Sequence, residues 1–366
     1  MPLFPTIVLG DLHGNREVLM RALTDLGLTD SAGHWTGSAR RLVQVGDLID
    51  RGPDPLGTLD LMMRLQAEAQ AAGGEVVCLL GNHELMALQA AEGDHAVRIQ
   101  WTYNGAGAEL AQWGARRGVA VDDGVLPYPE AFYTDFARDG AYGRWLDSLP
   151  VACRVGDYIA VHAGWTPDGP ESLEAANAPA PRAQIHGLVW ARRQPESEIA
   201  AACSQLGCRG LIAGHSVQPG VRTSLEGRLI QIDVGMWYYE TWMALGLDDA
   251  GRPWALAEGR EPALIEGDGL VPLNKQLPAQ AAAPEPRYRA GDLVRIYLAP
   301  DGSYRHYFLV EGMTEFHGYP AYNGRNLVFA ENRWASRPAV NPPFCERVDR
   351  FGCPGERSEV PADLLE

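Results

Sequence analysis

The segment Leu42-Val43-Gln44-Val45-Gly46-Asp47-Leu48-Ile49-Asp50-Arg51-Gly52 passes from a short apolar run into a group of charged residues. Apolar runs of this length that end at turn-forming residues are typical of buried strands. The same arrangement recurs at 6–10, 76–81, 158–161 and 210–214, where the runs lead to Asp11 and His13, Asn82 and His83, His162, and His215. Open α/β sheets build their sites at the carboxyl ends of strands. We therefore predict that five strands bring these side chains to one place.

The bulk composition restricts the class of protein. The chain has 366 residues, 46% of them hydrophobic and 21% charged, which is ordinary for one large or two smaller globular domains. Its formal net charge of −16 argues against general binding to DNA or RNA, because nucleic-acid binders usually carry a basic surface. The sequence has no apolar run long enough for a membrane span, and residues 1–10 lack the basic residue of a signal peptide. We expect a cytoplasmic protein without a membrane partner.

Composition also divides the chain into parts. Residues 1–275 contain all the strand-end motifs, and their segment 85–150 has the pattern of a helical, cap-like insertion. Residues 276–286 are rich in Pro and Ala, which is typical of a linker. Residues 287–366 are rich in aromatic residues, and their apolar runs at 293–298 and 306–310 indicate strands. We predict a small β-rich domain there, with an SH3-like barrel as the candidate fold and a protein partner as the candidate ligand.

The strand-end residues have the chemistry of a two-metal phosphoesterase. Two divalent ions roughly 3.5–4 Å apart activate a water molecule and neutralise phosphoryl oxygens. Such ions need carboxylate, amide and imidazole ligands. The first ion would be held by Asp11 and His13, the second by Asn82, His162 and His215, and both by a bridging Asp47.

Three further residues have candidate catalytic roles. His83 can protonate the leaving group, Asp50 can orient His83, and Arg51 can bind phosphate oxygens with its planar guanidinium. Each motif alone also has a structural explanation, as a turn, a loop salt bridge, a helix cap or a core histidine. Their occurrence together, each after an apolar run, favours catalysis. The remaining histidines do not follow such runs and are interpreted as surface or capping residues: His34, His95, His186, His306 and His317.

The motifs resemble the phosphoprotein phosphatase branch of the calcineurin-like metallophosphoesterase superfamily. Residues 10–14, 46–52 and 81–84 are similar to its three signature blocks, and 161–164 and 214–217 to its two later histidine blocks. The resemblance covers about residues 6–250. It implies an α/β fold, a four-layer β-sandwich flanked by helices, with a pair of Mn, Fe or Zn ions, of which Mn is expected. Trp190-Ala191-Arg192-Arg193 resembles the Trp-x-Arg of bacterial and phage members, which implies Arg192, or else Arg193, as a second phosphate ligand.

The substrate is less determined than the chemistry. Residues 50–54, 82–86 and 232–236 are similar to Shewanella-like protein phosphatases, whereas 101–107 and 162–164 resemble bacterial serine/threonine phosphatases and dinucleoside-tetraphosphate hydrolases. Ala163 stands where the eukaryotic pattern has a second Gly. We expect a protein serine/threonine or tyrosine phosphatase, with a bis(5'-nucleosyl)-tetraphosphatase and a non-catalytic phosphate-sensing scaffold as alternatives. A nucleotide enzyme needs a surface for a base, for which the candidates are Trp101, Tyr103, Trp113 and Tyr128, although aromatics at such spacing are more often core residues.

Overall fold

A computed structural model of the chain describes residues 4–122, 128–178, 185–192, 194–273, 289, 292–298, 305–316, 319–330, 333–341 and 353–354. These residues belong to two compact units, Met1–Gln276 and Leu277–Glu366. None of the helices in the described ranges is long and apolar enough to cross a membrane.

The first unit contains two mixed sheets of six strands. The first has the order β11-β10-β9-β1-β2-β3, in which β1, β2 and β3 are parallel and the other strands antiparallel to their neighbours. The strands are β1 (Thr6–Leu9), β2 (Arg41–Gln44), β3 (Glu75–Cys78), β9 (Met243–Leu247), β10 (Pro253–Ala257) and β11 (Ala263–Leu264). Helices α1 (Arg16–Asp25) and α2 (Pro55–Ala71) connect the parallel strands.

The second sheet has the order β12-β7-β8-β6-β5-β4, and its three central strands β8, β6 and β5 are parallel. Its strands are β4 (Ala152–Val155), β5 (Tyr158–Val161), β6 (Gly210–Ala213), β7 (Gly220–Ser224), β8 (Leu229–Gln231) and β12 (Gly269–Pro272). Between β5 and β6 lie α8 (Leu173–Asn177), α9 (His186–Trp190) and α10 (Glu196–Leu206), and the short α11 (Met236–Tyr239) follows β8.

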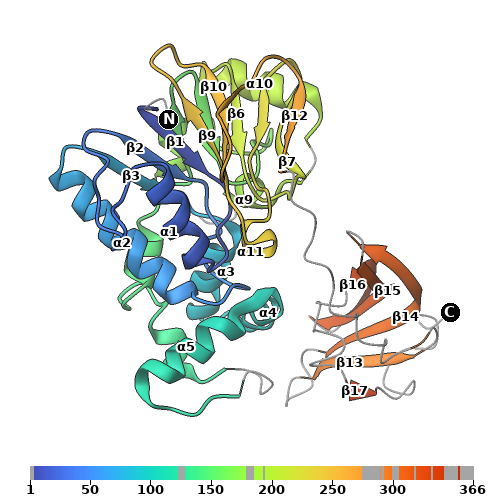
Figure 1. Ribbon diagram of the computed structural model, residues 1–366. Coiled ribbons are helices and arrows are strands. Elements are labelled where there is room, and N and C mark those ends of the chain that lie inside the picture. The colour runs from blue at the N-terminus through green and yellow to red at the C-terminus, as the bar shows by residue number, and fades with distance from the viewer. Residues whose placement is uncertain are drawn as a thin grey trace. The chain divides into compact units, whose positions relative to one another are not determined.

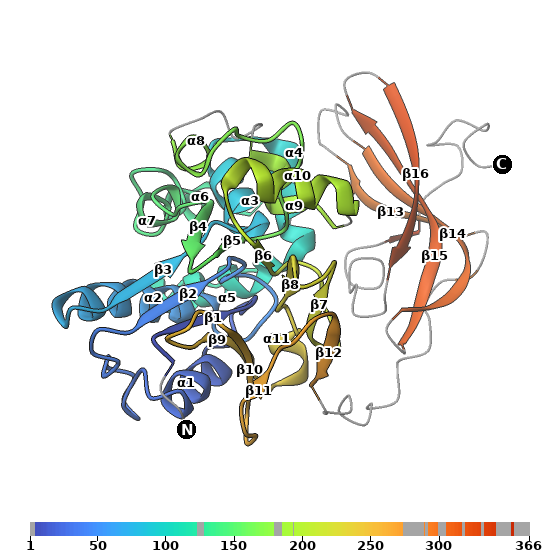
Figure 2. The ribbon, with the colours of Figure 1, turned by 90° about the horizontal axis from the view of Figure 1, so that it is seen from above.

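The two sheets pack face to face. Successive side chains of a strand point to opposite faces, so Val8 of β1 lies in a core shared with Ile212 and Ile230 of the second sheet. Its neighbours Ile7 and Leu9 instead join the core that includes the helices. In Figures 1 and 2, α1 and α2 flank the sheet of β1–β3, and α10 flanks the sheet that contains β6. The predicted four-layer α/β sandwich is confirmed.

The segment predicted as an insertion is helical where it is described. It contains α3 (Asn82–Ala91), α4 (His95–Trp101), the π-helix η1 (Thr102–Ala106), α5 (Gly107–Arg117), α6 (Glu130–Thr134) and α7 (Gly143–Asp147). Its core is aromatic: Trp101 stacks on Phe132 with ring centroids 5.4 Å apart, and Phe136 contacts Trp101 edge-on at 5.0 Å. All four aromatics considered for base stacking are at most 8% exposed. They therefore belong to the core of this helical segment.

The second unit contains one antiparallel sheet of five strands in the order β16-β15-β14-β13-β17. The strands are β13 (Leu293–Leu298), β14 (Arg305–Phe316), β15 (Tyr319–Ala330), β16 (Arg333–Asn341) and β17 (Cys353–Pro354). The strands predicted at 293–298 and 306–310 fall within β13 and β14. The predicted linker at 276–286 lies outside the described residues, and the SH3-like type of fold stays a prediction.

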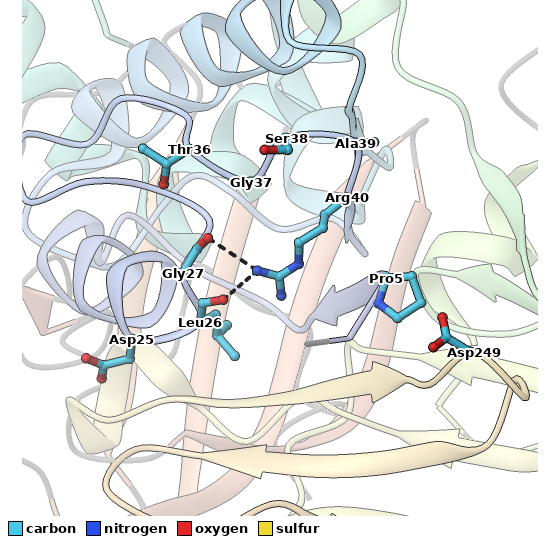
Figure 3. Close-up of a pocket in the computed structure, with 10 residues that line it drawn as sticks. All are labelled: Pro5, Asp25, Leu26, Gly27, Thr36, Gly37, Ser38, Ala39, Arg40 and Asp249. Atoms are coloured by element: carbon cyan, nitrogen blue, oxygen red, sulfur yellow. Dashed lines mark hydrogen bonds between the residues drawn. The ribbon is translucent and has the colours of Figure 1, made fainter. Parts of the chain in front are cut away.

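A surface recess of about 720 Å³ lies at the amino ends of β1 and β2, where Pro5 and Arg40 line it (Figure 3). Arg40 donates hydrogen bonds to the carbonyl oxygens of Leu26 at 2.8 Å, Gly27 at 3.2 Å and Phe4 at 2.9 Å. Its guanidinium is thus engaged with the backbone. Because the strand-end motifs lie at the opposite edge of the sheet, this recess is separate from them.

Candidate metal centre

The carboxyl ends of β1, β2, β3, β5 and β6 bring the predicted site residues together inside the first unit. The six predicted metal ligands are at most 5% exposed, as are His83 and Asp50. By contrast, the side chains of Arg51 and Arg192 are exposed. Arg193, the alternative to Arg192, lies outside the described residues. The result is a buried set of oxygen and nitrogen ligands with two exposed arginine residues beside it.

The backbone of these loops is strained. Among the described residues, nine that are not glycine have positive φ, and five of those belong to the site: His13 (44°), Asp47 (57°), Asp50 (70°), Arg51 (68°) and His215 (62°). Such conformations cost of order 1–3 kcal/mol each and persist where surrounding contacts impose them. The amide groups of Leu12 and His13 both donate to the carbonyl oxygen of Asp47, at 3.0 and 2.9 Å, which ties the first two loops together. Strain of this kind is common at functional sites.

The carboxylate of Asp47 lies between two groups of imidazoles. Its Oδ2 is 3.5 Å from Nε2 of His13 and 3.7 Å from Nε2 of His83. Its Oδ1 is 3.3 Å from Nε2 of His162, whose ring lies next to His215. His13, Asp47 and His83 form one candidate ligand group, and Asp47, His162 and His215 form another. This placement is what a bridging carboxylate requires.

Hydrogen bonds from the backbone orient the ligand atoms. Nδ1 of His13 is 2.9 Å from the carbonyl oxygen of Ile49, and Nδ1 of His162 is 2.8 Å from that of Val45. A carbonyl accepts the Nδ1 proton and leaves Nε2 free to bind an ion. Asn82 joins the second group, with Oδ1 2.9 Å from Nε2 of His162. The buried Nε2 of His215 has no hydrogen-bond partner among the described residues.

Asp11 contacts the backbone of His215. Within the described residues it belongs to neither candidate ligand group. Instead its two carboxylate oxygens accept the amide proton of His215, at 3.1 and 3.0 Å. Burial raises the pKa of Asp11 well above its usual value, and the nearby carboxylate of Asp233 adds to the effect. Its contribution to an ion's coordination is thus a proposal.

Asp233 is a buried carboxylate that the predicted ligand set did not include. It follows β8 as the other ligands follow their strands, so the same pattern could have identified it. Burial raises its pKa to about 6. Burial would also raise the pKa of Asp47, but His162 and His83 hold it well below its usual range. The nearby carboxylates of Asp11 and Asp233 repel that of Asp47, and a bound cation would relieve this repulsion.

The protonation states of the imidazoles also suit metal ions. Burial lowers the pKa of His13 to about 3 and that of His215 to about 2, so both rings are neutral and can donate a lone pair. Burial also disfavours charge on His162, but the adjacent Asp47 carboxylate outweighs it and raises the pKa of His162 to about 10. An ion would displace that proton. Neutral imidazoles, an amide oxygen and repelling carboxylates are a donor set that fits a pair of divalent ions.

A second layer of contacts holds His83. Its Nδ1 contacts Oδ2 of Asp50. Nε1 of Trp101 donates to both oxygens of Asp50, at 2.9 and 3.1 Å, and Oε1 of Glu109 accepts the amide proton of Asp50 at 2.5 Å. Burial, followed by the charge of Glu109, raises the pKa of Asp50 well above its usual value. The predicted pair of Asp50 and His83 is formed, and its supports come from the helical segment.

Glu84 organises the loop after β2. Its carboxylate accepts amide protons from Asp47 and Gly81, both at 2.9 Å, and from Leu48 at 2.8 Å. Burial raises the pKa of Glu84 to about 7. Nothing in the spacing of the motif distinguishes Glu84 from an ordinary first-turn glutamate of a helix. Its role follows from the contact between the amino end of α3 and the loop.

Two arginines contact the ligand residues. Nη1 of Arg51 is 2.8 Å from Nε2 of His13, and Nη2 is 3.0 Å from Nε2 of His83. Nη1 of Arg192 donates to the carbonyl oxygen of His215 at 3.2 Å. Partial burial lowers the pKa of Arg192, and the charge of Arg51 lowers it further. Two guanidinium groups that repel each other favour an anion between them.

Among the other histidines, His34 pairs with the carboxylate of Glu68 at 3.0 Å. His186 stacks on Trp190, and neither His186 nor His95 belongs to a candidate ligand group. The side chains of His306 and His317 lie outside the described residues.

Comparison with known proteins gives the site a family context. A family model described as calcineurin-like phosphoesterase matches residues 4–219. Shewanella-like protein phosphatase 2 of Arabidopsis thaliana is 29% identical over 280 residues, covering 63% of this chain and 71% of the relative. Serine/threonine-protein phosphatase 1 of Salmonella typhimurium is 37% identical over 187 residues, covering 51% of this chain and 68% of the relative.

A solved structure shares the fold. The cold-active protein-tyrosine phosphatase of a psychrophilic Shewanella species aligns with a TM-score of 0.57 and 21% identity, over 71% of this chain and 80% of that one. Further relatives, named symmetrical bis(5'-nucleosyl)-tetraphosphatase, match this chain over less than half of their own length.

Proposed function

The chain belongs to the calcineurin-like phosphoesterase family, and is thus a hydrolase of phosphoester bonds, and we propose that it is a two-metal phosphomonoesterase whose substrates are phosphorylated proteins. The observation that carries the proposal is the placement of the Asp47 carboxylate, whose two oxygens face different imidazoles. One of its oxygens faces His13 and the other faces His162, beneath the guanidinium of Arg51. This arrangement suits two ions that share one ligand and a phosphoryl group bound above them.

The residues of the chain take distinct parts in this proposal. Asp11 and His13 would hold one ion, Asn82, His162 and His215 the other, and Asp47 both. When bound, such ions supply Lewis-acid activation of water and neutralise phosphoryl charge. Mn is the expected metal, with Fe or Zn as alternatives.

Arg51 and Arg192 would orient the phosphoryl group by charge-assisted hydrogen bonds. His83 would give a proton to the leaving oxygen, and Asp50 would hold its ring. Burial lowers the pKa of His83 well below its usual value, so the free imidazole is neutral. A bound phosphoryl dianion would favour the protonated imidazole, which is the form that an acid needs.

The preference for phosphoproteins rests on the protein phosphatases among the relatives. The alternative, a dinucleoside-tetraphosphate hydrolase, is favoured by relatives of that name. It needs an accessible surface for a base, and Trp101, Tyr103, Trp113 and Tyr128 are all buried. A base would thus have to contact other residues.

The decisive experiment compares phosphopeptides, a sugar phosphate and diadenosine tetraphosphate after chelation and after addition of Mn. We expect chelation to abolish turnover, Mn to restore it, and the phosphopeptides to be the best substrates. Full activity in a protein that elemental analysis shows to be free of metal would refute the mechanism. Faster turnover of the dinucleotide would refute the substrate class and leave the mechanism in place.

A further inference from the structure

Two indole rings pack against imidazoles of the metal centre. The ring of Trp237 lies edge-to-face to the imidazole of His13, with centroids 6.1 Å apart. The ring of Trp190 lies edge-to-face to His215 at 6.0 Å. Both tryptophans are half-buried, and each packs against a buried candidate ligand. The proposed chemistry uses neither of them.

Trp237 is the one on the side of the candidate acid. The guanidinium carbon of Arg51 lies 5.6 Å from the centroid of its indole ring, and the same guanidinium contacts Nε2 of His83 at 3.0 Å. Since His83 is expected to face the leaving oxygen, the group attached to that oxygen would lie close to the indole. Trp190, in contrast, borders His215.

The position of Trp237 is held from both sides. It lies in α11, a single turn that begins after Gly235, whose amide proton is accepted by Asp233 at 2.9 Å. Met236 is 1% exposed and anchors the turn in the core. After the turn, the carbonyl oxygen of Glu240 accepts a hydrogen bond from Arg21 of α1 at 2.8 Å. A ring fixed in this way offers a preorganised surface, which costs little conformational entropy on binding.

We infer that Trp237 is a specificity-determining residue that favours aryl phosphoesters, and among proteins phosphotyrosine, over alkyl esters. The inference rests on the proposed phosphomonoesterase function. In an aryl ester a flat ring is attached directly to the ester oxygen, where it can contact the indole. The side chain of phosphothreonine or phosphoserine presents no such surface. Aromatic pairs contribute about 0.5–1.5 kcal/mol beyond area burial, which corresponds to roughly a 2- to 10-fold preference.

The test measures kcat/KM of the full-length, Mn-loaded protein on a phosphotyrosine peptide and a phosphothreonine peptide with the same flanking sequence. We expect Trp237→Ala to lower kcat/KM on the phosphotyrosine peptide about 2- to 10-fold, mainly through KM. The value for the phosphothreonine peptide should change less than about twofold, and Trp237→Phe should keep most of the preference. Trp254→Ala, which removes a half-buried tryptophan in β10, controls for general destabilisation. If Trp237→Ala does not fold, Trp237→Leu is compared with Trp237→Phe.

Inhibition by inorganic phosphate distinguishes two roles of Trp237, contact with the leaving group of the substrate and support of the Arg51 guanidinium. An unchanged inhibition constant in Trp237→Ala agrees with contact to the leaving group. Equal losses on both peptides together with weaker phosphate inhibition would overturn the inference, because the indole would then act only through the guanidinium. Phenyl phosphate and glycerol phosphate are measured in parallel. A protein that cleaves these two esters but neither peptide would refute the phosphoprotein proposal. The ratio of kcat/KM for phenyl phosphate to that for glycerol phosphate would still decide the role of Trp237.

Discussion

At the scale of single residues, the geometry of His83 agrees with two different roles, that of a metal ligand and that of a general acid. It forms a candidate ligand group with His13 and Asp47, yet its other nitrogen contacts Asp50. A metal ligand and a general acid need the same Nε2 atom. Removal of the side chain distinguishes the two, because only a ligand is required to retain the ion.

We predict that His83→Ala keeps its metal content and loses about 10²–10⁴-fold in turnover, the usual contribution of general acid catalysis. The loss should be smaller for aryl phosphates, whose leaving groups need less protonation. Elemental analysis and kinetics over a series of leaving groups measure both effects. His34→Ala is the matched control, since that ring is 61% exposed and pairs with Glu68 outside the site. A fall in metal content, or an equal loss for every leaving group, would assign His83 to the metal.

Asp50 is expected to act through His83. Asp50→Asn should reduce turnover in the same pattern but less, because the ring keeps its place while losing its charged partner. Trp101 and Glu109 would still hold the loop through their contacts with residue 50. Metal content should equal that of the unsubstituted protein, and a variant that loses metal would show that Asp50 supports the ligands directly.

At the scale of elements, the amino end of α3 and the loop after β2 act as one unit. The helix places Asn82 and His83 in the site, and Glu84 in the same turn binds the amide groups of Asp47, Gly81 and Leu48. The π-helix η1 adds a contact from the other side, where the amide of Arg51 donates to the carbonyl oxygen of Gly105 at 3.3 Å. Gly105 has φ of 120°, and a Cβ there would lie 2.6 Å from the amide nitrogen of Arg51. These contacts hold the positive-φ loop in place.

Glu84→Gln tests this unit. A glutamine has one acceptor oxygen for the four amide groups that Glu84 binds, those of Asp47, Leu48, Ile49 and Gly81. Buried donors are then left without partners, at about 1–3 kcal/mol each. We predict a lower free energy of unfolding together with reduced metal content. Chemical denaturation and elemental analysis give the two quantities. Glu17→Gln, at an exposed position of α1, should change neither. Wild-type stability in Glu84→Gln would mean that the loop holds its shape without the carboxylate.

At the scale of the whole molecule, every candidate site residue lies in the first of the two compact units. We predict that a chain shortened to end near Lys275 folds and cleaves a small aryl phosphate at a rate close to that of the full chain. Its activity on phosphoproteins should change more, if residues 287–366 contribute to the choice of large substrates. Circular dichroism and parallel assays on small and large substrates measure this. An insoluble product, or equal losses on both substrates, would contradict the proposed separation into domains.

The sequence alone was sufficient for the family, the four-layer sandwich and the convergence of the strand-end residues, because each candidate ligand directly follows an apolar run and strand ends meet at one edge of a sheet. The order of apolar and polar residues along the chain is enough to predict these features. It could not give the placement of the two Asp47 oxygens, the hydrogen bonds that Asp50 accepts from Trp101 and donates to Glu109, or the indole of Trp237 beside Arg51. These contacts join residues 51, 59 and 186 positions apart. They depend on how separate helices and loops pack together, and the spacing of residues along a chain does not determine that packing.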